Sequence, residues 1–396
     1  MSKRYRVSLL FNANKVYDRQ VIQGVGEYLQ AQQVDWDIYL EEDFRINIEN
    51  IESWLGDGTI ADFDDPDIVS LLATKQIPVV GVGGSYQKPE DYPPVPYVAT
   101  DNVGLVEMAF EHLKSKGIQR FAFYGLPDNS NLRWAEEREK AFVAVTEKHG
   151  FESRVFKGGL FLPYSWQHDL NRLTDWIQTL PKPIGIIAVT DSRARHILQV
   201  CERQNVMVPD NIALIGIDNE ELARFVTRTP LSSVEQGCQK MGYEAARLLD
   251  NLLAQRYSET KPSKPCRIII SPERVHERQS SDFRALQDPY VIQALHFIRH
   301  NACKGIKVEQ VLDYVNISRS NLENRFKSEL DHSIHKEIHD AKLNKAKELI
   351  LHTTLPMSEI AAVCGYPSLQ YMYTVFKKDL NITPAECRAS INPSDE

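Results

Sequence analysis

The feature that most constrains the fold of this 396-residue chain is a change of pattern near residue 285. Before it, short β-branched runs alternate with amphipathic helical stretches, and after it almost every segment has helical periodicity. The break is polar over Arg278–Asp282 and is soon followed by Pro289. Alternating strands and helices predict parallel sheets with right-handed crossovers. We therefore expect an α/β region in residues 1–280, a linker at 281–288 and an all-α domain at 289–396.

The α/β region contains more strands than one six-stranded sheet can use. The expected strands are Val7–Phe11, Ile38–Leu40, Thr59–Ala61, Val79–Val82, Tyr97–Ala99, Phe121–Tyr124, Gly185–Val189 and Ile212–Ile217. The clearest helices among them are Val103–Lys116 and Ser192–Gln204. We predict two doubly wound lobes rather than one sheet.

Composition excludes several classes of protein. The 42% hydrophobic content allows a sizeable core in each domain. The apolar run near the N-terminus, Val7–Phe11, is shorter than a secretory signal needs, and no stretch approaches the roughly 20 apolar residues of a membrane span. The six cysteines lie far apart with no C-x-x-C pair. We expect a soluble cytoplasmic protein with no membrane partner, metal site or disulfide framework.

Polar side chains follow several of the expected strands. They include Asn12, Asp18, Arg19, Asp101, Asp191, Asp218 and Asn219, with Arg133, Trp134 and Arg138 after the strand that ends near Tyr124. Doubly wound sheets bind ligands at the carboxyl ends of their strands. Carboxylates, amides and arginine pair with vicinal hydroxyls, and aromatic faces cover C–H groups. Each Asp or Asn alone is as readily the N-cap of the next helix, so the prediction of a small polyhydroxylated ligand depends on the set.

Enzyme motifs are missing. The glycines of Gly81–Ser85 do not have the G-x-G-x-x-G spacing and are expected to form a tight turn. No G-x-S-x-G, H-E-x-x-H or P-loop motif occurs. The acidic run of Asp62, Asp64 and Asp65 precedes Pro66, which favours a helix start over a metal site. We predict no catalytic residue and no cofactor; a dehydrogenase is the enzyme alternative.

Three segments of the α/β region carry a family resemblance. Gly185–Asp191, Leu214–Asn219 and Ser232–Gly242 resemble signature segments of periplasmic sugar-binding proteins and of the LacI-type effector core. The resemblance implies that Asn12, Arg138, Asp218 and Gln236 contact a sugar between two lobes joined by three crossings, with Asp191 in support or in contact. The complete set of expected sugar-binding residues is Asn12, Asp18, Arg19, Asp101, Arg138, Asp191, Asp218, Asn219 and Gln236.

The last third of the chain contains one pattern twice. Residues 306–327 and 357–378 each have a short apolar helix, a tight turn and a second helix that ends in Phe-Lys, which predicts two helix-turn-helix units. Asn316 and Gly365 suit the positive φ of the turns. The faces expected in a DNA major groove carry Arg319, Ser320, Glu323, Asn324, Lys327, Gln370, Tyr373, Thr374 and Lys377.

A helix over Ile334–His352 is expected to join the two units. Its length of about 28 Å is close to one turn of DNA, so both second helices could reach successive major grooves. The domain is similar to AraC/XylS-type DNA-binding domains along nearly its full length, most clearly over Ile360–Lys378 and at Thr383-Pro384. Asp331 and Asn381 stand where that family usually has glycine.

The order of the two domains adds a further resemblance. A LacI-like core placed before an AraC-type domain, with the segments Leu9–Gln20 and Gly365–Tyr371, is similar to bacterial regulators of xylose genes. That resemblance implies a homodimeric activator of D-xylose uptake and catabolism genes, switched by D-xylose, with double-stranded operator DNA and RNA polymerase as partners. Another pentose or a small polyol is the alternative effector, and a transport solute-binding protein the alternative class.

The net charge of −8 excludes a uniformly basic DNA-binding surface. Residues 287–396 hold 13 Lys and Arg against 14 Asp and Glu, and the rest of the chain holds 33 against 40. The nearly neutral helical domain must therefore concentrate its basic residues near the second helices. The residues expected there are Arg319, Arg325, Lys327, Lys377 and Lys378.

Overall fold

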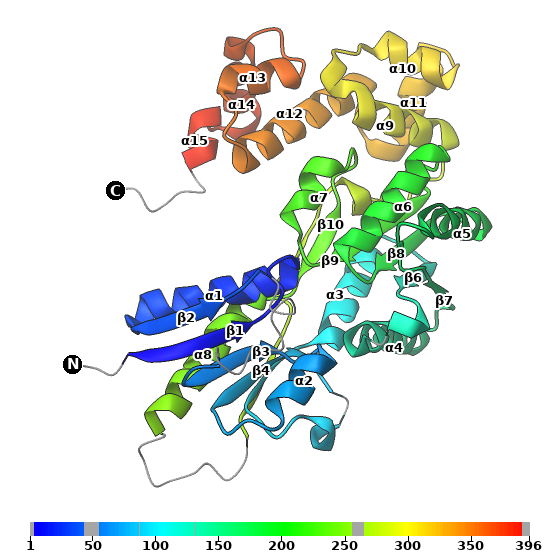
Figure 1. The fold of residues 1–396 in the computed structure, drawn as a ribbon. Coiled ribbons are helices and arrows are strands. Elements are labelled where there is room, and N and C mark those ends of the chain that lie inside the picture. The colour runs from blue at the N-terminus through cyan, green and yellow to red at the C-terminus, as the bar shows by residue number, and fades with distance from the viewer. Residues whose placement is uncertain (1–3, 43–54, 87, 131, 256–264, 390–396) are drawn as a thin grey trace. The chain divides into compact units, whose positions relative to one another are not determined.

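The chain separates into two compact units, residues 1–283 and residues 284–396, in a computed structural model (Figure 1). The structure describes residues 4–42, 55–86, 88–130, 132–255 and 265–389. The outer ends of the expected domains, residues 1 and 396, lie outside the described residues.

The described strands of the first unit form two six-stranded sheets, each the centre of one lobe. The sheet of lobe 1 has the order β11-β5-β4-β3-β1-β2, and that of lobe 2 the order β12-β10-β9-β8-β6-β7. The strands of lobe 1 are β1 (Tyr5–Leu10), β2 (Trp36–Leu40), β3 (Gly58–Asp62), β4 (Val79–Gly84), β5 (Tyr97–Thr100) and β11 (Arg267–Ile270). Those of lobe 2 are β6 (Phe121–Gly125), β7 (Ser153–Lys157), β8 (Ile184–Ala188), β9 (Ile212–Ile217), β10 (Ser232–Glu235) and β12 (Arg274–His276).

Every described strand pair is parallel except β10 with β12, so the predicted doubly wound architecture is confirmed. All eight predicted strands are present. Four further described strands, β7, β10, β11 and β12, are only three to five residues long, and each includes polar residues. Such short, partly polar segments give too weak a periodic signal to be predicted from the sequence.

Helices cover both faces of each sheet (Figure 1). In lobe 1, α1 (Val16–Gln32) and α8 (Cys238–Gln255) pack on one face and α2 (Pro66–Leu72) on the other. In lobe 2, α3 (Asn102–Ser115) and α4 (Arg133–Lys148) face α5 (Trp166–Thr179) and α6 (Asp191–Arg203) across the sheet, with α7 (Glu221–Val226) after β9.

Among the described elements, the chain crosses between the lobes three times, as predicted. The crossings follow β5, follow β10 and join β11 to β12. Backbone hydrogen bonds connect neighbouring crossings: the Asp101 N–H donates to Ile270 O at 3.1 Å, and the Glu273 N–H donates to Glu235 O at 2.9 Å. The carboxyl ends of the parallel strands thus lie beside the crossings.

The second unit is helical. Its helices are α9 (Pro289–Asn301), α10 (Val308–Val315), α11 (Arg319–Leu330), α12 (Ile334–His352), α13 (Met357–Val363), α14 (Leu369–Leu380) and α15 (Pro384–Ala389). The pairs α10–α11 and α13–α14 are the predicted helix-turn-helix units, and α12 has the predicted bounds. Asn316 and Gly365 have φ of 59° and 68° at the turns. Asp331 and Asn381 adopt φ of 59° where α11 and α14 end, without the glycine that usually allows it.

Helices α1 and α8 approach each other so closely that the contact points have room only for glycine. A Cβ on Gly24 of α1 would lie 1.8 Å from the carbonyl oxygen of Gln239, and one on Gly242 of α8 would lie 1.9 Å from Val21 O. Both obstacles are backbone atoms, which cannot swing aside. These two glycines therefore set the distance between the helices that cover one face of lobe 1.

We predict that Gly24→Ala destabilises lobe 1 by about 1–3 kcal/mol, because the added methyl group forces α1 away from α8. Gly26→Ala is the matched control in the same helix, since nothing lies within 4 Å of a Cβ there. It should stabilise the protein by about 0.5–1 kcal/mol through helix propensity. Urea unfolding followed by circular dichroism measures both, and equal midpoints for the two variants would contradict the close-packing argument.

Candidate ligand site and candidate nucleic-acid interface

Arg138 is the centre of a polar cluster in lobe 2. Its side chain projects from α4, the residue is 3% exposed, and it donates to three acceptors from three segments. Nε donates to Asn102 Oδ1 at 2.9 Å, Nη1 to Val189 O at 2.7 Å and Nη2 to Gln236 Oε1 at 2.9 Å. These bonds use three of the five guanidinium N–H groups, and the other two have no hydrogen bond to the described residues. Burial lowers the pKa of Arg138, and the charge of Asp218 opposes that shift.

Gln236 joins Arg138 to Asp218. Its Nε2 donates to Asp218 Oδ1 at 2.5 Å while its oxygen accepts from Arg138. Burial raises the pKa of Asp218 to about 6, although Arg138 acts in the opposite direction. Asp218 also has φ of 125° directly after β9, a conformation that costs free energy in a residue with a side chain. Strained backbone of this kind is concentrated at ligand sites, so the geometry at Asp218 favours a binding role.

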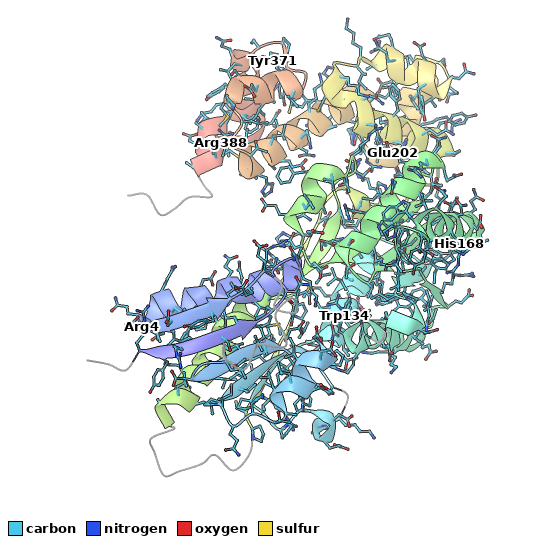
Figure 2. The ribbon with its side chains drawn as sticks, in the orientation of Figure 1. Arg4, Trp134, His168, Glu202, Tyr371 and Arg388 are labelled. Carbon is cyan, nitrogen blue, oxygen red and sulfur yellow. The ribbon has the colours of Figure 1, made fainter. Side chains whose placement is uncertain are left out.

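Aromatic rings lie beside this cluster. The ring of Trp134 is 4.8 Å from the Arg138 guanidinium carbon, and Figure 2 shows Trp134 at the start of α4, on the side toward lobe 1. From lobe 1, the Tyr17 hydroxyl lies 3.1 Å from Thr100 Oγ1. Flat apolar faces next to hydrogen-bonding groups suit a sugar, which presents hydroxyls at its edge and C–H groups on its faces.

Lobe 1 contributes a buried carboxylate, Asp18. Asp18 is fully enclosed, and its Oδ2 accepts from the Asn12 N–H at 2.6 Å. Its Oδ1 is buried and has no hydrogen-bond partner among the described residues, so it is an unsatisfied acceptor. Lys15 pairs with the neighbouring Asp62 at 3.2 Å. Burial, followed by the charge of Asp62, raises the pKa of Asp18 to about 7, and Lys15 limits the rise.

Arg133 connects the two lobes. Its side chain leaves α4 of lobe 2 and reaches the ends of β3 and β4 in lobe 1. Nη2 donates to Asp64 Oδ1 at 2.7 Å, Nη1 donates to Ser85 O, and the guanidinium carbon lies 3.6 Å from the centre of the Tyr86 ring. Burial and Asp62 raise the pKa of Asp64 to about 7, while Arg133 opposes the rise.

Glu137, one turn along α4, completes this connection. Its Oε2 accepts from Asn102 Nδ2 at 2.9 Å and from Ser85 Oγ at 3.3 Å. Asn102 therefore joins Glu137 to Arg138, since its oxygen accepts from Arg138. The contacts between the lobes and the Arg138 cluster thus form one network.

The predicted sugar-binding residues fall into two groups. Asn12, Asp18, Arg138, Asp218 and Gln236 belong to the clusters at the strand ends described above. The others have local partners that account for their position. Arg19 donates to Ala13 O at 2.9 Å, and Asp101 caps α3 by accepting from the Gly104 N–H. Asp191 accepts from Ser233 Oγ and from the Glu220 N–H. The side chain of Asn219 forms hydrogen bonds with those of His276 and Arg278. Asp191 uses both oxygens in this way, which makes it a support for the β9 end.

Several residues of the site are absent from the predicted set. Asp65 does cap α2, as the helix-start interpretation requires, by accepting from the Asp67 N–H at 3.0 Å. Asp62 and Asp64, however, turn toward Lys15 and Arg133. The available signal is their position directly after β3, because every parallel strand of a doubly wound sheet ends at the same edge. Arg133 and Trp134 follow a predicted strand in the sequence but are not among the predicted sugar contacts.

The predicted DNA-binding residues lie on α11 and α14. Most are exposed: Arg319, Ser320, Asn324, Lys327, Gln370, Thr374 and Lys377 are exposed, and Glu323 and Tyr373 are half-buried. Glu323 accepts from the Ile334 N–H at 3.3 Å, so it also supports the start of α12. Arg325, one of the basic residues expected near the second helices, lies on α11 itself, where it donates to Asp288 and its guanidinium carbon lies 4.8 Å from the centre of the Tyr290 ring.

Metal-binding clusters and membrane-spanning helices are both absent from the described part of the chain. No group of three or more His, Cys, Asp and Glu side chains in the described ranges is arranged to hold a metal ion. Within those same ranges, no helix has the length and apolar character needed to cross a membrane.

Comparisons with known proteins support this architecture. Residues 6–103 match the family described as the XylR N-terminal domain, residues 110–281 the periplasmic binding protein-like domain and residues 311–390 the helix-turn-helix domain. The xylose operon regulatory protein of Escherichia coli K12 is 59% identical over 387 residues, which are 98% of this chain and 97% of that protein. Its counterpart in Haemophilus influenzae is 50% identical over 385 residues, 97% of this chain and 98% of the other.

Solved structures agree. One described as the xylose-binding transcription activator xylR has a TM-score of 0.89 at 57% identity, covering 98% of this chain and 99% of its own. A complex of the regulator CelR with cellobiose has a TM-score of 0.55 at 21% identity, covering 71% and 86%, and shares the fold. A periplasmic-binding-protein-like unit followed by a helix-turn-helix unit defines the class of DNA-binding transcription regulators, not enzymes. Within that class the chain belongs to the family of xylose operon regulatory proteins.

The buried carboxylates predict a pH dependence of stability. Asp18 and Asp64 have pKa values of about 7 in the folded protein against an ordinary value of 3.8. Between these values the folded chain keeps protons that the unfolded chain has lost, so unfolding releases them. Stability should therefore fall as pH rises from about 4 to about 7, and Asp18→Asn, which cannot ionise, should flatten the decline. Thermal unfolding across this interval measures it.

Asp35→Asn is the control for this measurement, because Asp35 lies exposed in lobe 1, where its carboxylate is 3.3 Å from Arg4 Nε. Its pH profile should follow that of the unaltered chain. Parallel profiles for all three proteins would refute the assignment of the decline to Asp18.

Proposed function

We propose that D-xylose binds between the two lobes of residues 4–283, and that binding increases operator affinity and activates genes for D-xylose uptake and catabolism. The observation that carries the proposal is the Arg138–Gln236–Asp218 chain on lobe 2, together with the buried Oδ1 of Asp18 on lobe 1, which has no partner among the described residues. Guanidinium N–H groups donate to sugar oxygens, whereas carboxylates accept from sugar hydroxyls. A pentose that is contacted from both lobes stabilises the lobe arrangement in which the binding groups of lobe 1 and those of lobe 2 can contact it at the same time.

The proposed contacts are Asn12, Asp18, Arg138, Asp218 and Gln236, with Trp134 and Tyr17 beside the C–H faces of the sugar. The family relationship supports a xylose-linked function. The solved structure at 57% identity is described as a xylose-binding transcription activator, which supports both the effector and the activating role. Another pentose or a small polyol is the alternative effector, because it would offer similar hydroxyls to the same groups.

The second unit supplies the proposed DNA contact. The exposed faces of α11 and α14 enter successive major grooves on one side of the operator, separated by α12. A homodimer presents two such units, so that the sugar-dependent arrangement of the lobes decides whether both half-sites are occupied at once. RNA polymerase is the proposed further partner of the DNA-bound dimer.

We expect D-xylose to bind the full-length chain more tightly than L-arabinose, D-ribose or xylitol in a calorimetric titration. At a pH of about 8, above the pKa of Asp18, Asp18→Asn should weaken D-xylose binding about 10- to 100-fold, because a charge-assisted hydrogen bond contributes about 1.5–3 kcal/mol. Asp35→Asn, exposed on the same lobe, should bind as the unaltered chain does. Tighter binding of another sugar would select the alternative effector, and equal affinities for the two variants would remove Asp18 from the site.

DNase footprinting tests the second half of the proposal. D-xylose should lower the protein concentration needed to occupy the operator. Lys327→Gln and Lys377→Gln should each weaken binding with and without sugar, and reduce the slope of log affinity against log salt by about 1 for a lost phosphate contact. Calorimetric affinity for D-xylose should stay unchanged in both. Identical occupancy with and without D-xylose would refute the switch.

A further inference from the structure

The start of the second unit, residues 284–290, is held against the first helix-turn-helix unit; we call this segment the linker clamp. Arg284 Nη1 lies 3.5 Å from Glu337 Oε2 in the first turn of α12. The Gln287 N–H donates to Glu329 Oε2 of α11 at 3.3 Å. The two acceptors, Glu329 and Glu337, lie on either side of the junction between α11 and α12.

The strongest contact of the linker clamp is between Asp288 and Arg325. Asp288 Oδ2 accepts from Arg325 Nη1, and the two side chains are only 14% and 35% exposed. The Arg325 guanidinium carbon also lies 4.8 Å from the centre of the Tyr290 ring, and its Nε donates to Asn321 Oδ1 at 2.6 Å. A partly buried pair with fixed geometry holds two elements together more firmly than an exposed one.

Asp288 uses its two oxygens for different tasks. Oδ1 caps α9, accepting from the Tyr290 N–H at 2.9 Å and the Val291 N–H at 3.3 Å. Oδ2 faces Arg325 of α11. One carboxylate therefore fixes both the start of α9 and its position against the second helix of the first helix-turn-helix unit.

Apolar packing extends the same connection. Val291, Leu295 and Ile298 of α9 share a core with Val311 of α10 and Phe326 of α11. A separate core forms around Ala346, Ile360 and Phe376, in which no α9 residue takes part among the described residues. The linker clamp, α9, α10 and α11 thus pack as one body, and α12 leads from it to α13 and α14.

We propose that the linker clamp passes the movement of the sugar-binding unit to the first helix-turn-helix unit, with Asp288 and Arg325 as the positioning residues. The inference rests on the proposed function, because it needs a sugar-dependent change in DNA binding. If the sugar-binding unit rotates residue 284, α11 rotates with it, because the linker clamp is bonded to α11 and to the first turn of α12. The second helix-turn-helix unit lies farther from residue 284: the movement reaches it along α12 and through Cys303, which follows α9 and packs against the second core.

The test compares operator affinity with and without D-xylose in the full-length chain. Asp288→Asn keeps the cap of α9, because asparagine caps helices as well as aspartate does, but it removes the charge that pairs with Arg325. Arg325→Gln removes the other partner. We expect each variant to reduce the ratio of the two affinities at least fivefold, and the double variant to reduce it no further than the single ones. Calorimetric affinity for D-xylose should stay within twofold.

Two further variants guard against loss of folding and against a general effect of charge. Glu329→Ala removes an exposed contact of the linker clamp and leaves the core intact, so it should lower the ratio while operator affinity without sugar persists. Glu309→Gln breaks the exposed Arg319–Glu309 pair, which joins α10 to α11 without touching the clamp, and should leave the ratio unchanged.

The possible failures are distinguishable. If the unaltered chain responds to D-xylose and Asp288→Asn, Arg325→Gln and Glu329→Ala respond equally, the linker clamp has no role in the switch and the inference is overturned. If the unaltered chain binds its operator equally with and without D-xylose, the proposed function itself fails, and the transmitting role of the clamp fails with it. A purely structural role would lower both affinities together and keep their ratio, which also overturns the inference.

Discussion

The Arg138 guanidinium is almost wholly enclosed, and a buried charge costs several kcal/mol unless neighbouring groups compensate it. Here Asn102, Val189 and Gln236 accept its hydrogen bonds, and the charge of Asp218 opposes the fall in pKa that burial causes. Asn102 directly follows the first crossing between the lobes, and Gln236 belongs to the second. One side chain therefore fixes the positions of two crossings, so a ligand that touches it acts on the segments about which the lobes must turn.

Sequence patterns predicted the lobes and helix-turn-helix units because continuous apolar strands and the twice-repeated helical pattern are local signals. The polar edge strand β7 carries no such signal, being half-buried along its length. Asp62 and Asp64 were assigned to a helix start because of the neighbouring Pro66, although only Asp65 caps the helix. Arg325 lies on α11 as expected, but its pairing with Asp288, 37 residues earlier, was not predictable because periodicity carries no signal over that separation. Local order was predictable, and pairings between distant charges were not.

Two half-buried cations of the nearly neutral second unit bind backbone oxygens of the unit itself. Lys342 Nζ donates to Gly365 O at 3.1 Å, beside the turn of the second helix-turn-helix unit. Arg388 Nη2 donates to Leu355 O at 2.7 Å and ties α15 to the segment before α13. These residues satisfy carbonyl groups at helix ends and turns, where unpaired backbone oxygens are costly. Lys342 and Arg388 are thereby engaged within the unit, so contacts with phosphates depend on the correct placement of the exposed basic residues of α11 and α14.

The contact of Gly24 with Gln239 joins parts of the chain that are more than 200 residues apart. Lobe 1 is built from residues before α3 and after β10, with nearly all of lobe 2 inserted between them. During synthesis, α1 emerges long before the α8 that covers the same face of its sheet. Lobe 2 can complete most of its sheet first, while the apolar face of lobe 1 stays open to water and to other nascent chains. The order of translation thus leaves the first hundred residues without α8, one of the two helices that cover this face of their sheet, until most of lobe 2 has been made.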